Sequence, residues 1–144
     1  MDGAVTLVKY ALLNRRRTML IHERPLIVLT SRIGCPDEDA LDVTRKSGDA
    51  GLAFAPSWDI LRPQIALRHA GLETPEQWER YKALYTAEMR VSYARSRPAW
   101  DALLARRRAV LCCYCNLASH PGMCHRLLLA QMLVKCGAVY LGEW

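Results

Sequence analysis

The chain has 144 residues, of which 51% are hydrophobic and 24% are charged, a composition typical of a folded globular domain that excludes an intrinsically disordered protein. Its 20 basic and 14 acidic residues give a formal net charge of +6 at pH 7, which weakly favours phosphorylated or polyanionic partners. No apolar stretch is long enough to span a membrane. The basic cluster 15–17 follows an apolar run instead of preceding it, so we expect no secretory signal.

These totals predict a single domain, 1–144, located in the cytoplasm. In that compartment the six cysteines are expected to be thiols, metal ligands or redox groups instead of disulfides.

The first part of the chain contains two predicted strands and a long loop. Residues 4–13 are apolar enough for a strand that leads into a short helix. The run 26–29 follows Pro25 and is rich in β-branched residues, which predicts a buried strand. The polar segment 33–55 is then expected to be a loop, and a loop of this length usually serves a function.

Three helices are predicted next. Ser57 caps the first, which ends at Gly71, and the third starts near Pro98 and closes on the arginine cluster 106–108, interpreted as a solvated helix end. The second helix has the clearest start signal, with Thr74 at the cap, Pro at the next position and Gln three residues on. Its apolar stripe keeps helical spacing and consists of Trp78, Tyr81, Tyr85 and Met89.

A second buried strand is predicted over 109–114, followed by a turn, an apolar helix over 124–136 closed by Gly137, and a last strand over 138–141. Strands that alternate with helices indicate a parallel sheet. We therefore predict a three-layer α/β fold, with a mostly parallel sheet of about four strands and helices on both faces.

The densest group of reactive side chains lies between Cys112 and Arg126. Ligands of such sheets bind beyond the carboxyl ends of the strands, so the segments Thr30–Arg32 and Tyr114–Met123 should open onto one edge. Strand alternation places Cys113 and Cys115 on one face and Cys112 on the other.

Three interpretations of this group compete. In the first, Cys112, Cys113 and Cys136 are small core hydrophobes. In the second, zinc binds to Cys113, Cys115 and His120 together with Cys124 or His125, although this spacing matches no standard zinc finger. In the third, Cys124 and Arg126 form an anion or nucleophile site, because the free N–H groups at a helix start attract anions and lower the pKa of a thiol.

The pattern "VLCCYCN", then "CHRLLLAQML" and "GAVYLGE", resembles the bacterial and phage family known as domain of unknown function 488. The segments "LTSRIGCP" at 29–36 and "FAPSWDIL" at 54–61 are similar to the earlier strand and the Ala-Pro motif of that family. The resemblance implies an α/β fold with a site at Cys124, His125 and Arg126. Many members have an acidic residue where this chain has Cys115, which favours metal or redox chemistry here.

The leading functional hypothesis is an enzyme or binding protein for a phosphorylated small molecule, such as a nucleotide or a nucleic-acid component. Cys124 and His125 would perform the chemistry, and Asp42 would act as general base. The remaining predicted ligand-binding residues are Ser31, Arg32, Cys115 and Arg126. The alternatives are a non-catalytic nucleic-acid-binding module, and an interaction domain stabilised by zinc. The substrate and the oligomeric state stay open.

Overall fold

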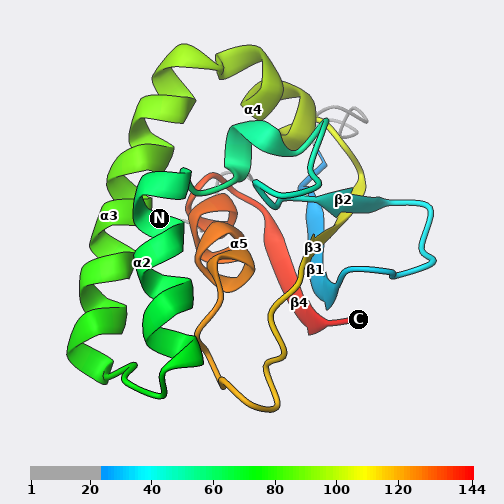
Figure 1. The fold of residues 1–144 in the computed structure, drawn as a ribbon. Helices are drawn as coiled ribbons and strands as arrows, with labels where there is room; N and C mark the ends of the chain where they lie inside the picture. The colour runs from blue at the N-terminus through cyan, green and yellow to red at the C-terminus, as the bar shows by residue number, and fades with distance from the viewer. Residues whose placement is uncertain (1–23) are drawn as a thin grey trace.

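The computed structural model describes residues 24–144 (Figure 1). The predicted strand and helix within residues 4–13 lie outside this range. The elements in chain order are β1 (Ile27–Arg32), β2 (Ala40–Asp42), the 3₁₀ helix η3 (Leu52–Phe54), α2 (Trp58–His69), α3 (Pro75–Arg95), α4 (Arg97–Leu104), β3 (Arg108–Cys113), α5 (His125–Lys135) and β4 (Val139–Glu143). None of the helices in the described part of the chain is long and apolar enough to cross a membrane.

The four strands form one parallel sheet in the order β2-β3-β1-β4. This confirms the prediction of an α/β fold with a mostly parallel sheet of about four strands. In the central pair, Ser31 lies beside Cys112 and Arg32 lies beside Cys113. The carboxyl ends of β1 and β3 therefore meet at one edge, as expected.

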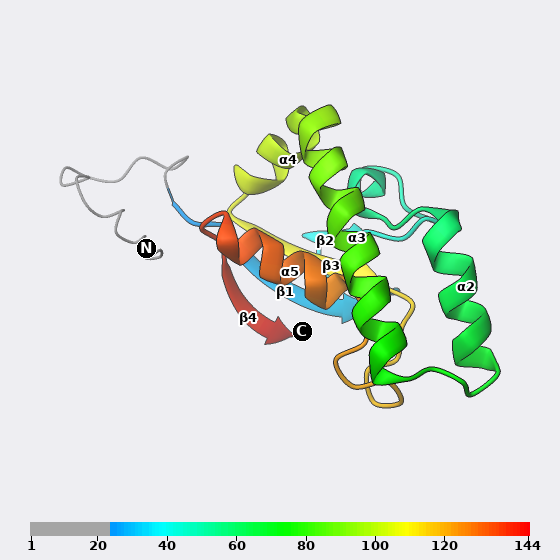
Figure 2. The same cartoon turned by 90° about the vertical axis from the view of Figure 1, so that its left-hand side faces the viewer.

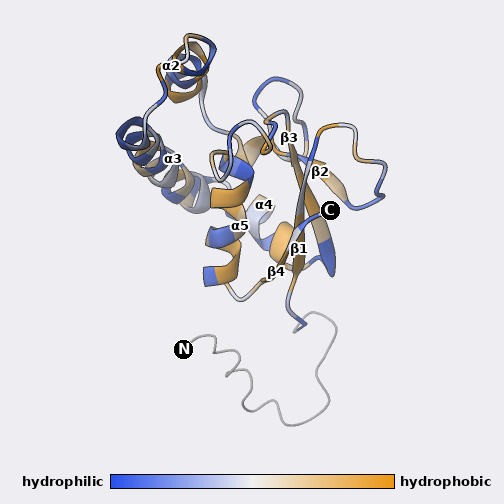
Figure 3. Cartoon of the chain, turned by 90° about the horizontal axis from the view of Figure 1, so that it is seen from below, coloured by the Kyte–Doolittle hydropathy of each residue, from blue (hydrophilic) through white to orange (hydrophobic). Residues whose placement is uncertain are grey.

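The helices between residues 24 and 144 cover one face of the sheet. The connections β2 to β3 and β3 to β4 run in the same direction across the sheet, so right-handed crossovers place their helices on the same side. α5 packs against β1, β3 and β4, and α3 packs on α5, as Figures 2 and 3 show.

The expectation of helices on both faces is therefore not met within the described residues. The connection from β1 to β2 runs in the opposite direction and crosses the other face, but residues 33–39 form no helix. Arg108 at the start of β3 fixes this segment through Asp37 at 2.8 Å and Asp39 at 3.1 Å. The predicted role of cluster 106–108 as a helix end is wrong, because α4 ends at Leu104 and Arg108 belongs to β3.

The predicted start and apolar stripe of α3 are confirmed. The Gln77 N–H donates to Thr74 Oγ1 at 3.2 Å, and the Thr74 N–H donates to Gln77 Oε1 at 3.0 Å, so both halves of the capping box are present. All four stripe residues are buried, and Tyr85 donates its hydroxyl to the Phe54 carbonyl at 2.7 Å. This bond ties η3 to α3.

Two other expectations for this half of the chain need correction. Ser57 precedes α2, but its hydroxyl bonds to Glu88 on α3 instead of capping the helix. Segment 33–55 is not one loop, because it contains β2 and η3. β2 is only three residues long and lies at a sheet edge, so its apolar alternation is too short to predict a strand.

Candidate functional site

A cavity of about 560 Å³ opens at the carboxyl end of β3. Its floor contains three cysteines and a histidine, and its walls come from α2, the start of α3, segment 44–46 and the turn between β3 and α5. The residues on its floor are Cys113, Cys115, Cys124 and His125. The largest apolar residues on its walls are Trp58, Leu61, Ile65, Trp78 and Tyr81.

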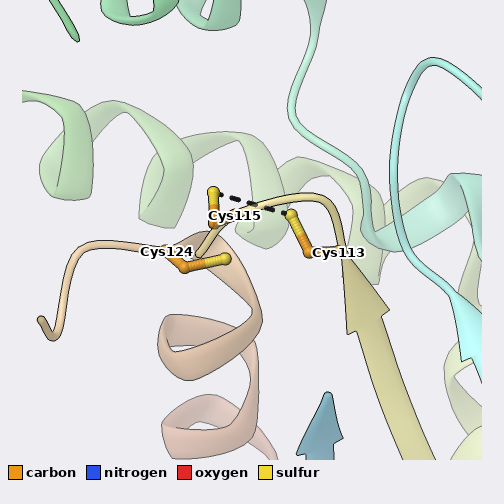
Figure 4. Close-up of side chains that lie close together, drawn as sticks. All are labelled: Cys113, Cys115 and Cys124. Atoms are coloured by element: carbon orange, nitrogen blue, oxygen red, sulfur yellow. Dashed lines mark hydrogen bonds between the residues drawn. The ribbon is translucent and has the colours of Figure 1, made fainter. Parts of the chain in front are cut away.

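The three thiols come together because the chain leaves β3, turns and re-enters the fold as α5. Cys113 ends β3, Cys115 lies in the turn, and Cys124 directly precedes α5 (Figure 4). All three sulfurs lie within 4.8 Å of one another, and the Cys113 and Cys115 sulfurs are 3.9 Å apart. Cys113 and Cys124 are buried, whereas Cys115 is partly exposed. The predicted shared face of Cys113 and Cys115 agrees with this arrangement.

His125 connects this cluster to the segment after β2. Its Nδ1 lies 3.6 Å from Cys113 Sγ, and its Nε2 lies 2.8 Å from the Val43 carbonyl oxygen. A carbonyl oxygen only accepts, so Nε2 carries the proton and Nδ1 is left as an acceptor toward the thiol. The ring is buried beside Tyr85, and burial lowers the pKa of His125, which favours the neutral imidazole.

The thiols differ strongly in acidity. Hydrogen bonding of the Cys113 sulfur with the Cys115 and Cys124 side chains lowers the pKa of Cys113. The pKa of Cys124 is raised well above its ordinary value, mainly by burial and to a lesser extent by the hydrogen bonds with Cys113 and Cys115. The prediction of a lowered pKa at Cys124 is therefore wrong, although its sulfur does accept the Arg126 N–H at 3.5 Å as a helix cap. Desolvation by burial outweighs the helix-start effect.

The other predicted core cysteines behave differently from each other. Burial raises the pKa of Cys112 to about 11, and this thiol faces away from the cavity, as the core interpretation predicts. Cys136 follows α5 and is exposed, so the core interpretation is wrong for this residue. Cys113 is buried but lines the cavity, and it is more than a packing residue.

Arg126 is a buried structural residue. Its guanidinium donates to both oxygens of Glu143, at 3.2 and 2.9 Å, and to the Cys115 carbonyl at 2.9 Å. Burial works against its charge, but the Glu143 carboxylate and the neighbouring thiols more than offset this and hold the pKa of Arg126 above its ordinary value. Arg126 is 0% exposed and does not line the cavity, so it is not free to bind a ligand anion.

Ser31 and Arg32 are also placed away from the cavity. Ser31 is buried beside Cys112, on the face of β3 opposite Cys113. Arg32 is exposed, and its guanidinium donates to the Tyr114 carbonyl at 3.4 Å. The structure therefore does not bring Ser31, Arg32 and Arg126 to a common crevice, because alternation along β1 and the burial of Arg126 separate them.

Asp42 organises the segment that follows β2. Its carboxylate accepts the Thr44 N–H at 2.9 Å, the Thr44 hydroxyl at 2.6 Å and the Ser47 hydroxyl. Partial burial opposes ionisation, but the bonds from Ser47 and Thr44 hold the pKa of Asp42 below its ordinary value. With its oxygens engaged and no place on the cavity lining, Asp42 has the geometry of a turn anchor instead of a general base.

The predicted zinc ligand His120 lines the cavity but lies outside the thiol cluster. Its Nδ1 is 3.7 Å from Glu73 Oε1. No local pattern in the sequence indicates a role for Arg68. Its guanidinium pairs with Glu73 at 2.9 Å and donates to Cys115 Sγ at 3.4 Å and to the Met123 carbonyl at 3.0 Å. Arg68 thus joins α2 to the thiol-containing turn.

The chain matches the sequence profile of DUF488-N3a, described as the active DUF488-N3 subclade, over residues 32–137. It belongs to the DUF488 family. This confirms the resemblance seen in the Cys-His-Arg motif and in the earlier strand, and the matched range contains the three clustered thiols and His125. No curated protein and no solved structure matches the chain significantly.

Proposed function

We propose that this DUF488 protein is an enzyme that binds a nucleotide, or a similar phosphorylated molecule with a flat ring, in the cavity. Cys113 is the proposed nucleophile and His125 its base. The observation that carries the proposal is the row of three groups at the cavity floor: Cys113 Sγ lies 3.6 Å from His125 Nδ1, and His125 Nε2 lies 2.8 Å from the Val43 carbonyl. A nucleophile beside a base that a third group orients is the general geometry of covalent catalysis.

In this scheme each proton has a defined place. His125 Nδ1 takes the proton from the Cys113 thiol as the sulfur forms a bond to an electrophilic carbon of the substrate. The bond from that carbon to its leaving group breaks, and the leaving group takes the proton from Nδ1. The Val43 carbonyl holds the Nε2 proton throughout and favours the cationic imidazole that forms in between.

The ligand class is proposed from the walls of the cavity. Trp58, Trp78 and Tyr81 offer apolar, aromatic surface to a flat ring. Lys46 lies at the cavity rim, 5.3 Å from the centre of the Tyr114 ring. The residues that line the cavity within the described chain include no aspartate or glutamate. An anionic group on the ligand would therefore meet no opposing carboxylate there.

The test combines ligand binding with thiol labelling. Thermal shift titrations with nucleoside mono-, di- and triphosphates should identify a binder, and Trp58→Ala should weaken its binding at least tenfold. Trp144→Ala is the matched control, because Trp144 lies outside the cavity lining. Iodoacetamide should label Cys113 before its neighbour Cys112, and the bound nucleotide should slow this labelling. Fast labelling of Cys112 with an inert Cys113 would contradict the proposed nucleophile.

Zinc binding is a second candidate function, and the proximity of the three thiols favours it. Cys113, Cys115 and Cys124 lie close enough together to hold a metal ion, and thiolate sulfur is a ligand that zinc prefers. The set differs from the one predicted from the sequence, because His120 is engaged at Glu73. One sulfur cannot serve as nucleophile and as metal ligand at the same time, so the labelling of Cys113 in metal-free and zinc-loaded protein separates the two candidates.

A further inference from the structure

We infer that a thiophilic divalent cation bound to Cys113, Cys115 and Cys124 keeps its fourth coordination position open to the cavity, where it takes a neutral nitrogen donor of a heteroaromatic ring. This inference rests on the zinc candidate function and specifies the ligand class of that site. It does not depend on the proposed nucleophilic role of Cys113.

The spacing of the sulfurs fits a tetrahedral metal. With metal–sulfur bonds of about 2.3 Å, two ligands of a tetrahedral zinc ion lie about 3.8 Å apart. The Cys113 and Cys115 sulfurs are already 3.9 Å apart, and all three sulfurs lie within 4.8 Å of one another. Only small side-chain rotations are needed to bring the third sulfur to bonding distance.

The protein supplies no fourth ligand among the described residues. The metal-ligating group there consists of the three cysteines alone. His125 Nδ1 lies 3.6 Å from Cys113 Sγ, but it does not lie within 4.8 Å of all three sulfurs, so the ring is not part of that group. His120 lies against Glu73. A metal with three protein ligands keeps a position for water or substrate, which distinguishes catalytic from structural zinc sites.

The open position faces the cavity because all three cysteines line it. The two arginines beside the sulfurs act as second-layer donors: Arg68 reaches Cys115 Sγ at 3.4 Å, and Arg126 reaches Cys124 Sγ at 3.8 Å. Both are already neutralised by glutamates, Arg68 by Glu73 and Arg126 by Glu143. Three thiolates with one divalent cation then leave one net negative charge, so a neutral donor is favoured over an anion.

The aromatic walls indicate which neutral donor fits. Trp78 and Tyr81 stack on each other with ring centres 5.2 Å apart, and both line the cavity together with Trp58. A heteroaromatic ring can rest on this surface while one of its ring nitrogens reaches the metal.

The experiment uses the full chain loaded with Co²⁺ as a spectroscopic substitute for Zn²⁺. One Co²⁺ per chain should bind and give sulfur-to-cobalt charge-transfer absorption. Cys113→Ser, Cys115→Ser and Cys124→Ser should each weaken binding at least tenfold, whereas Cys112→Ser, the buried neighbour on the other face, should not. As a check that needs no variant, Zn²⁺ should protect these three thiols of the wild-type chain from alkylation while Cys136 stays reactive.

Imidazole, the simplest neutral ring-nitrogen donor, is then titrated into the Co²⁺ protein. We expect a saturable shift of the visible d–d bands, and a weaker response to azide, which is an anion. A spectrum of bound Co²⁺ that does not change with imidazole, or that changes with His120→Ala, would contradict the open fourth position. Either outcome would leave zinc binding as a candidate function. Failure to bind metal would overturn both, and would leave the Cys113 chemistry to its own labelling test.

Discussion

Arg126→Ala should destabilise the protein strongly, although the sequence places Arg126 in a motif that suggests a ligand-binding role. The side chain is 0% exposed and bonds to Glu143 and to the Cys115 carbonyl. Truncation removes these bonds, leaves the Cys115 carbonyl without its donor and opens a void. Loss of one partner of a buried pair costs about 3–5 kcal/mol of unfolding free energy, and a large-to-small change in a core costs a similar amount. The loss of the ion pair and the loss of packing both result from the same truncation, so the two free-energy costs are not added together. Since Glu143 is half exposed and regains water, we expect the lower part of the range.

Urea and thermal unfolding, followed by far-ultraviolet circular dichroism, would measure this loss. A decrease of about 3 kcal/mol corresponds to a fall in Tm of about 10 °C for a domain of this size. Arg97→Ala is the matched control, since Arg97 also pairs with a carboxylate, Asp101, but both side chains are more than half exposed. It should cost about 0.5 kcal/mol or less. Equal losses of unfolding free energy in the two variants would refute the reasoning that burial makes the contribution of Arg126 large.

Three further predictions concern stability. Arg68 and Gln64 offset the effect of burial and hold the pKa of Glu73 below its ordinary value. The contribution of the Glu73 carboxylate to folding stability is therefore present above about pH 4.3 and is lost as the pH falls through the folded pKa. Urea midpoints of Glu73→Gln should already be low at pH 7 and should change less than those of the wild type between pH 5 and 3. Gly51→Ala should cost about 1–3 kcal/mol in urea unfolding, because a Cβ would lie 2.1 Å from the Asp42 carbonyl oxygen, whereas Ala50→Ser beside it should be nearly neutral. Thr74→Ala should lower the Tm by removing about 1 kcal/mol of capping, and an unchanged Tm would show that the capping box of α3 contributes nothing.

The features that were predictable from the sequence depend on neighbouring residues. The capping box joins Thr74 to Gln77, and the stripe from Trp78 to Met89 repeats at the helical period, so both could be read from a short window. The same holds for β1, β3 and α5. The parallel sheet followed from the alternation of these elements, and the family from the Cys-His-Arg motif.

The features that were missed depend on contacts between distant residues. Arg68 is separated from Cys115 by 47 residues, and His125 from Val43 by 82, so no local pattern could pair them. The structural role of Arg126 could not be predicted, because its partner Glu143 comes from another element. The acidity of Cys124 was predicted from its place at a helix start, but the two other sulfurs and burial determine it, and both require the assembled fold.

The connection from β1 to β2 and the helices lie on opposite faces of the sheet, and the two faces should differ in their tolerance to surface modification. Segment 33–39 is anchored by Arg108, and the Trp144 indole donates to Asp37 at 3.1 Å, but none of these residues lines the cavity. The cavity thus lies on the helical face of the sheet, away from segment 33–39. A label on an exposed side chain of segment 33–39 that leaves Asp37 and Asp39 intact would therefore report on the protein without entering the cavity.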